Sequence, residues 1–253
     1  MTQKAGGLYI ALLSIHGLIR WRNLELGRDA DTGGQTLYVV ELAQALAKQP
    51  GIAKVDLITQ RVVDANISPD YAKSIEILAD NLRIVRIDAG PEEYLAKEEL
   101  WDHLDFFTDN LAGFFRDSHS FPDIIHSHYA DAGYVGAHLA SRLGIPLIHT
   151  GHSLGRVKRS RLMASGLKAQ EIETRFNMSR RIEAEEQTLA TAERVITSTH
   201  QEIAEQYELY DHYQPDQMRV VPPGTDLNQF TPPKGDELQS SLFKELTCHL
   251  LAP

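Results

Sequence analysis

Short β-rich runs alternate with longer segments of helical period along this chain, and no other feature of the sequence restricts its fold as much. Strands separated in this way by helices are typical of a parallel sheet that helices cover on both faces. We therefore predict an α/β domain with a mostly parallel sheet. The predicted strands are residues 8–15, 55–60, 82–88, 123–129, 146–151, 194–199 and 218–222.

Three of the helices between these strands have clear signals. In the first, the apolar residues Val39, Leu42, Ala43 and Leu46 recur at i, i+3, i+4 and i+7. A second helix is predicted to start near Lys97 and to run through EELWDHLDFFTDNLAGFF. A third is predicted to span roughly residues 170–191, which contain many acidic residues and few helix breakers.

A long polar loop and two glycines precede the first predicted helix. Residues 16–32 form a longer connection than compact domains usually place between a strand and a helix, which indicates a functional or mobile segment. Gly33 and Gly34 then lead into the helix, whose free backbone amides can bind a phosphate or a sugar where no side chain blocks the approach. The spacing is not the GxGxxG of dinucleotide-binding proteins. On the residues alone, a simple turn remains the alternative.

The overall charge excludes two broad classes of partner. The chain carries 25 Lys and Arg residues against 35 Asp and Glu residues, a formal net charge of −10. Proteins that bind nucleic acids or membrane surfaces need a wide positive field. We therefore expect neither a nucleic acid nor a membrane as a partner, and any anion site must be local.

The single cysteine and the apolar N-terminal run indicate the compartment. Cys248 cannot form an internal disulfide, and no Cys/His cluster of zinc-binding spacing accompanies it, so a reducing cytoplasm fits. The run LYIALLSIHGLI lacks the charged region and the cleavage site of a signal peptide, and it is shorter than a membrane span. We therefore predict that it forms a core strand.

The last residues have the composition of a domain boundary. Residues 231–253 begin with TPPKGDE and end with HLLAP. A stretch rich in Pro, Gly and acidic residues is typical of a linker. We expect one domain over residues 1–230, followed over residues 231–253 by a linker or the truncated start of a further domain.

Polar residues follow two of the predicted strands. His126 and His128 lie on one face of a strand, which is one possible half of a metal site, but no third ligand with suitable spacing follows, so we expect no metal. The favoured interpretation is that Tyr129 and its polar neighbours face a ligand cleft. His152 and Ser153 follow the next strand without the GxSxG motif of serine hydrolases, and His152 alone could equally be a hydrogen-bonded core residue.

Positive charge is concentrated after Ser153 and in a later pair of arginines, in spite of the acidic composition. The later pair stands near three glutamates at helical spacings, so ordinary surface pairing explains much of this charge. Alternatively, basic groups near strand ends converge on one anionic substituent of a small ligand. The cations concerned are Lys97, Arg156, Lys158, Arg159, Arg161, Arg180 and Arg181.

Seven segments occur in the order GRDADTGGQTLYVVELAQAL, KEELW, HSHYADAG, TGHSLGRVK, RRIEAEE, VITSTHQEIAEQYELYD and RVVPPGTD. From about residue 8 to 230 they resemble the N-terminal half of the sucrose-phosphate synthases, which are retaining glycosyltransferases of the GT-B type. The resemblance implies two Rossmann-like domains with the active site in the cleft between them, this chain being the N-terminal, acceptor-binding domain. It also implies transfer of glucose from UDP-glucose to fructose 6-phosphate with retention, which releases UDP and sucrose 6-phosphate and requires no cofactor.

The resemblance further implies a role for each matching residue. The cleft floor is expected to contain Gly33, Gly34 and Gln35. Tyr129 and Ser153 resemble acceptor contacts, and His152 resembles the residue that touches the transferred glucose and helps to stabilise the transition state. The 6-phosphate of the acceptor is expected to bind Lys97, Lys158 and Arg181, together with Arg180.

This sequence departs from the family in its extent. Members of the family continue into a donor domain, which carries an Arg/Lys pair for the diphosphate and a Glu-rich motif for the nucleotide sugar, and this sequence stops before it. We therefore expect an acceptor domain that binds UDP-glucose through a missing C-terminal donor domain and is inactive alone. Two alternatives stay open: a sucrose synthase-like enzyme that uses free fructose, and a catalytically silent sugar-phosphate-binding module.

Overall fold

The computed structural model describes residues 6–225, 227, 231 and 232 of the chain. The residues up to Val221 belong to one compact unit, and the fold described below is that of this unit. The predicted domain end at residue 230 and most of the predicted linker over residues 231–253 lie outside the described residues. That boundary therefore stays a prediction.

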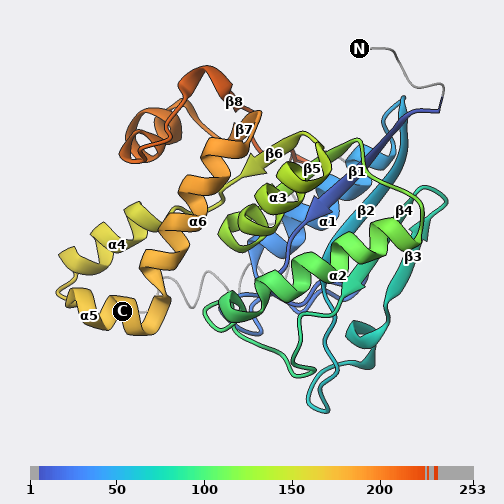
Figure 1. The fold of residues 1–253 in the computed structure, drawn as a ribbon, viewed down its shortest axis with the longest axis horizontal. Helices are drawn as coiled ribbons and strands as arrows, with labels where there is room; N and C mark the ends of the chain where they lie inside the picture. The colour runs from blue at the N-terminus through green and yellow to red at the C-terminus, as the bar shows by residue number, and fades with distance from the viewer. Residues whose placement is uncertain (1–5, 226, 228–230, 233–253) are drawn as a thin grey trace. The chain divides into compact units, whose positions relative to one another are not determined.

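The described residues form an eight-stranded sheet in the order β3-β4-β2-β1-β5-β6-β7-β8 (Figure 1). Every neighbouring pair is parallel except β3 and β4. The predicted, mostly parallel α/β fold is therefore confirmed. The strands are β1 (Leu8–Leu13), β2 (Ile52–Gln60), β3 (Ile75–Ala79), β4 (Leu82–Ile87), β5 (Ile124–His128), β6 (Leu147–Thr150), β7 (Arg194–Thr197) and β8 (Met218–Val220).

The strand β3 is the one that the sequence analysis did not predict. It pairs antiparallel with β4 at the edge of the sheet, and its neighbour in the chain is only two residues away. Its burial alternates between exposed and half-buried, with Ile75 and Ile77 exposed. Its segment IEILA is apolar at four of five positions but does not alternate strictly, so the two-residue connection Asp80–Asn81 was the clearer signal.

Helices cover both faces of the sheet, and the alternation of strand side chains separates two cores. In β1, Ile10 and Leu12 pack in one cluster with residues of α1 (Gly34–Ala47). Ala11 and Leu13 point to the other face and pack in a cluster with residues of α2 (Leu104–Asp117), α3 (Tyr129–Leu143) and α6 (Met178–Thr191). In Figure 1, α1 lies behind the sheet while α2 and α3 lie in front of it. Side chains that alternate between the two faces with a period of two residues are expected of strands buried on both faces.

Two predicted helices have other bounds in the structure. The helix predicted from Lys97 starts only at Leu104, after the short 3₁₀ turn Leu100–His103. The helix predicted over residues 170–191 is two helices, α5 (Ala169–Phe176) and α6, separated by Asn177. Asn177 has a left-handed φ of 45°, a conformation that asparagine adopts more readily than most residues, and this ends the helix.

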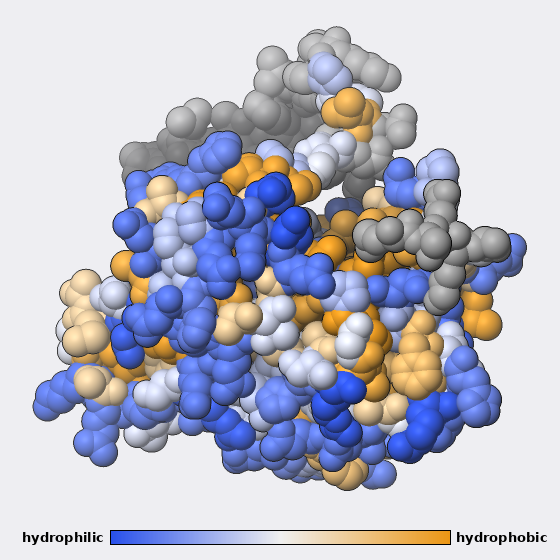
Figure 2. Space-filling view, turned by 45° about the horizontal axis from the view of Figure 1, so that its top comes forward, coloured by the Kyte–Doolittle hydropathy of each residue, from blue (hydrophilic) through white to orange (hydrophobic). Residues whose placement is uncertain are grey.

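The remaining helix, α4 (Gly155–Ala164), carries the cations that follow Ser153. Hydrophilic residues predominate on the face of the molecule shown in Figure 2, with apolar residues between them. None of the helices in the described part of the chain is both long and apolar enough to span a bilayer.

Candidate functional site

The candidate site lies at the carboxyl edge of three adjacent parallel strands. The chain reaches Gly33 after β1, Tyr129 directly after β5 and His152 after β6, and these strands are neighbours in the sheet. Tyr129 and His152 have left-handed φ angles of 76° and 57°. Such backbone conformations are costly for residues with side chains and are concentrated at functional sites. The edge is therefore where a ligand site is expected in this architecture.

The two glycines leave open space in front of the first helix. Gly33 is the N-cap of α1 and Gly34 its first residue, and no side chain caps this helix end. Apart from the adjoining residues and the helix's own backbone, a Cβ atom on either glycine would meet no atom of the described residues within 4 Å. The next residue, Gln35, donates a hydrogen bond from Nε2 to Ser14 Oγ at the end of β1, at 3.2 Å. A ligand can thus approach the helix amides closely.

Lys158 and Arg181, from two helices, lie near the same strand ends. Arg181 is buried, with 3% exposure, and donates to the backbone oxygen of Ser153 at 2.7 Å. Its guanidinium carbon stands 4.5 Å from the centre of the Tyr129 ring. Burial, and then the charges of Arg181 and Lys97, lower the pKa of Lys158. Lys158 is therefore within electrostatic reach of both Arg181 and Lys97, and also of the carboxylates of Glu98 and Asp31.

Carboxylates neutralise two of these cations and leave the third without a partner. Lys97 forms an ion pair with Asp31 and lies 3.5 Å from Glu98, and Arg181 pairs with Glu185 at 3.0 Å. Lys158 forms no ion pair with any described residue, and its Nζ lies 4.3 Å from the centre of the Phe176 ring. An unpaired, half-buried ammonium group favours an anionic ligand.

Arg180 does not join this group. Its guanidinium pairs with Asp102 and donates to the backbone oxygen of Trp101, and its side chain is 46% exposed. Successive residues of a helix point about 100° apart, so Arg180 cannot share the buried face on which Arg181 lies. Arg156 is also explained by structure, since it pairs with Glu186 and Asp211.

His152 is hydrogen-bonded to a second histidine. Its Nε2 lies 2.9 Å from Nδ1 of His128, and the edge of its ring contacts Tyr38. The predicted pair on one face of β5 is present, since the rings of His126 and His128 are 4.3 Å apart. Burial holds the pKa of His126 at about 3 and that of His128 well below its usual range. Among the described residues, no group of three or more His, Cys, Asp or Glu is placed to hold a metal ion.

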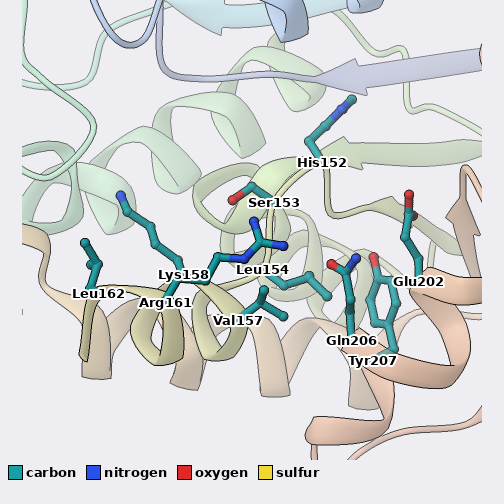
Figure 3. Close-up of a pocket in the computed structure, with 10 residues that line it drawn as sticks. All are labelled: His152, Ser153, Leu154, Val157, Lys158, Arg161, Leu162, Glu202, Gln206 and Tyr207. Atoms are coloured by element: carbon teal, nitrogen blue, oxygen red, sulfur yellow. The ribbon is translucent and has the colours of Figure 1, made fainter. Parts of the chain in front are cut away.

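A pocket of about 360 Å³ opens beside His152 and Ser153. Figure 3 shows Lys158 and Arg161 extending from α4 on one side and the segment Glu202–Tyr207 on the other, with the ring of His152 pointing away from α4. Arg161 forms no ion pair with any described residue, and no role was predicted for it.

The sequence analysis missed a second buried pair at this edge. Nδ1 of His16 lies 2.7 Å from a carboxylate oxygen of Asp131, and both residues are buried. The His16 ring contacts Tyr129 edge to face, with 4.6 Å between ring centres. The position of His16 at the start of the long loop after the first strand was a signal for it. Nothing in the spacing of the sequence pointed to Asp131.

Comparison with known proteins places this geometry in one group of enzymes. The profile described as Glycosyltransferase Family 4 matches residues 32–229. The chain is 41% identical to a probable sucrose-phosphate synthase 1 of Craterostigma plantagineum and 39% identical to sucrose-phosphate synthase 1 of Arabidopsis thaliana. Both alignments cover 92% of this chain but only 27% of the relative.

A solved structure supports the same relationship. The sucrose-phosphate synthase of Thermosynechococcus elongatus superposes with a TM-score of 0.70 at 27% identity, covering 92% of this chain and 52% of that one. The chain thus spans about a quarter of the length of the curated relatives that it matches, and about half of the solved structure.

Proposed function

Because the chain belongs to glycosyltransferase family 4, we propose that it is the acceptor-binding domain of a sucrose-phosphate synthase-type enzyme. Its sheet and helices form the N-terminal half of a GT-B fold. The proposed reaction transfers glucose from UDP-glucose to fructose 6-phosphate with retention and gives sucrose 6-phosphate and UDP. The observation that carries the proposal is Lys158, which is half-buried, forms no ion pair with any described residue and lies within electrostatic reach of Lys97 and Arg181.

The acceptor phosphate would bind at this group of cations. Lys158 is free to pair with it, while Arg181 holds the backbone of Ser153 and the ring of Tyr129 in place beside it. Phosphate bonds of this kind are charge-assisted and stronger than bonds between neutral groups. Arg180 is left out of the proposed set because its guanidinium is bound to Asp102.

Glucose transfer would take place at the glycine-rich start of α1, where the diphosphate of the donor and the sugar ring of the acceptor are proposed to meet. Negative charge builds up on the departing diphosphate in the transition state, and fixed donors directed at that charge lower the barrier. We propose that the amides after Gly33 and Gly34 are such donors and that His152, which follows β6 at the same edge of the sheet, contacts the transferred glucose. No carboxylate of this domain is proposed as a nucleophile.

Turnover would require further contacts to the donor. We propose that UDP-glucose is held mainly by a second domain, and that residues 1–253 alone form sucrose 6-phosphate at a negligible rate. The donor is a substrate, so no cofactor is proposed, and the single cysteine supports a reducing location such as the cytoplasm.

Fructose 6-phosphate should bind this chain at least about tenfold more tightly than fructose, because a well-placed charge-assisted bond contributes roughly 1.5–3 kcal/mol. The preference should decrease with added salt, since the site is open to water. Lys158→Ala should remove most of the preference and leave fructose binding nearly unchanged. Calorimetry at low and moderate salt measures all three effects.

Arg159→Ala is the matched control, because Arg159 is an exposed cation on the same helix. It should keep the preference. Equal affinities for the two sugars in the wild type would contradict the proposal and favour a sucrose synthase-like enzyme that uses free fructose. Tight binding of fructose 6-phosphate without turnover, even with a donor domain supplied, would indicate a silent binding module.

Gly34→Ala should weaken the binding of fructose 6-phosphate while leaving the protein as stable as before or more stable. Beyond its own helix and chain neighbours, the new methyl group would meet no atom of the described part of the chain within 4 Å, and it would stand in the space proposed for the ligand. Alanine also favours the helix by up to about 1 kcal/mol. Crowding the ligand should cost roughly 1–3 kcal/mol, or about 5- to 150-fold in affinity. Thermal unfolding and calorimetry on one sample separate the two effects.

Gly17→Ala serves as the control, because its added methyl group would meet the protein backbone and not open space. Gly17 has a φ of 80°, and its Cβ would stand 2.5 Å from the backbone oxygen of Asp31. This variant should lose stability. Full ligand affinity in a stable Gly34→Ala protein would show that the ligand does not approach this helix end.

A further inference from the structure

The hydrogen bond between His128 and His152 has one donor, and the surroundings of His128 determine which ring it is. The two nitrogens, Nδ1 of His128 and Nε2 of His152, are 2.9 Å apart. The side chain of His128 is fully buried, and its other nitrogen, Nε2, has no hydrogen-bond partner among the described residues. Neutral imidazole carries a single N–H, so the position of that proton in one ring fixes its position in the other.

If His152 donated the bond, His128 would hold its own proton on Nε2, buried and without an acceptor. An unpaired buried donor costs about 1–3 kcal/mol. If His128 donates from Nδ1 instead, its buried Nε2 is only an unused acceptor, and unpaired acceptors are tolerated more often than unpaired donors in protein interiors. His152, which is exposed and lines the pocket, then carries its proton on Nδ1, where solvent or a ligand can accept it.

We propose that His128 is a positioning residue that donates to Nε2 of His152 and so fixes His152 as a donor through Nδ1 to an oxygen of the bound sugar. Only the last step, the contact with the sugar, rests on the proposed function. The neighbouring side chains support a fixed arrangement. His126 stacks on His128 and is itself bonded to Thr150 at 2.9 Å, and Tyr38 contacts the rings of both His128 and His152.

Nitrogen-15 NMR of the histidine-labelled chain at neutral pH tests the proton positions directly, because protonated and bare ring nitrogens have distinct chemical shifts. The eleven histidines are distinguished by the loss of one signal in single variants such as His152→Asn. We expect both His128 and His152 to be protonated on Nδ1. A wild-type spectrum with the proton of His152 on Nε2 would overturn the proposal.

Two substitutions at His128 separate positioning from a general structural role. The side-chain amide of His128→Asn places an N–H near the position of Nδ1, so His152 should keep its tautomer. His128→Phe fills the space without a donor, so His152 should become a mixture of tautomers. An unchanged tautomer in a folded Phe variant would overturn the proposal. Should the Phe variant not fold, the wild-type and Asn spectra decide.

Binding of fructose 6-phosphate distinguishes this inference from the proposed function. The proposed contact of His152 is with the transferred glucose, and the acceptor phosphate is proposed to bind at Lys158. The affinity for fructose 6-phosphate should therefore stay near the wild-type value in both variants, whereas the tautomer of His152 should change only in the Phe variant. If His128 and His152 are both protonated on Nδ1 but fructose 6-phosphate does not bind, the result would support the role of His128 and count against the proposed function. Strong binding of fructose 6-phosphate with the proton of His152 on Nε2 would count against the role of His128 and support the proposed function.

Discussion

Acidification from pH 7 to pH 5 should destabilise the native domain by about 4 kcal/mol through two buried histidines alone. Burial lowers the pKa of His126 and that of His149 to about 3, so both stay neutral in the folded protein at pH 5. In the unfolded chain they bind protons below about pH 6.5. The unfolded state then holds more protons, so stability is fully present above that pH and falls as the pH decreases.

Urea unfolding at both pH values measures this loss, and substitutions assign it. His149 bonds to Ser127 Oγ at 2.9 Å, and His149→Gln keeps a polar group there that does not titrate. The variant should lose about 2 kcal/mol less than the wild type on acidification. His200→Gln, at an exposed position, should behave like the wild type. Equal losses in the His149 and His200 variants would show that His149 is protonated in the folded state.

Strands could be predicted from the sequence where their side chains are buried on both faces of the sheet. The alternation of Ile10 and Leu12 with Ala11 and Leu13 gives β1 a continuous apolar run. Helix α3 had no boundary signal, because it begins directly after β5 at Tyr129, whose left-handed backbone makes the turn without a glycine. A conformation imposed by tertiary packing leaves no mark in the local sequence.

The site was predictable in its location but not in its pairings. Strand ends placed Gly33, Tyr129 and His152 at one edge, whereas the choice of phosphate cations came from the family resemblance. Pairs such as Lys97 with Asp31 join segments 66 residues apart, and no spacing rule reports such contacts. One pairing, that of Arg181 with Glu185, follows from the helical period. Glu185 lies four residues after Arg181, so the helical period already placed Arg181, and not Arg180, beside it.

Arg181→Met should destabilise the domain by about 3–5 kcal/mol, the loss expected when one partner of a buried ion pair is removed. Arg181 and Glu185 are 3% and 2% exposed, and the guanidinium also binds the backbone oxygen of Ser153. Without the guanidinium, the carboxylate of Glu185 keeps only neutral donors, the amide of Gly155 at 2.9 Å and the hydroxyl of Tyr210 at 2.5 Å. Urea unfolding at neutral pH measures the difference.

Adding Glu185→Gln to the Arg181→Met variant tests whether the uncompensated charge of Glu185 causes the loss of stability. The glutamine amide oxygen can still accept from Gly155 and Tyr210, and no buried charge remains. The double variant should therefore recover part of the lost stability, because removing both charges is far less costly than removing one. A double variant less stable than Arg181→Met would show that Arg181 acts through its bond to Ser153 and its contact with Tyr129. In that case the guanidinium stabilises the strand end itself, and loss of sugar-phosphate binding in the single variant would reflect a displaced Ser153 in addition to a missing cation.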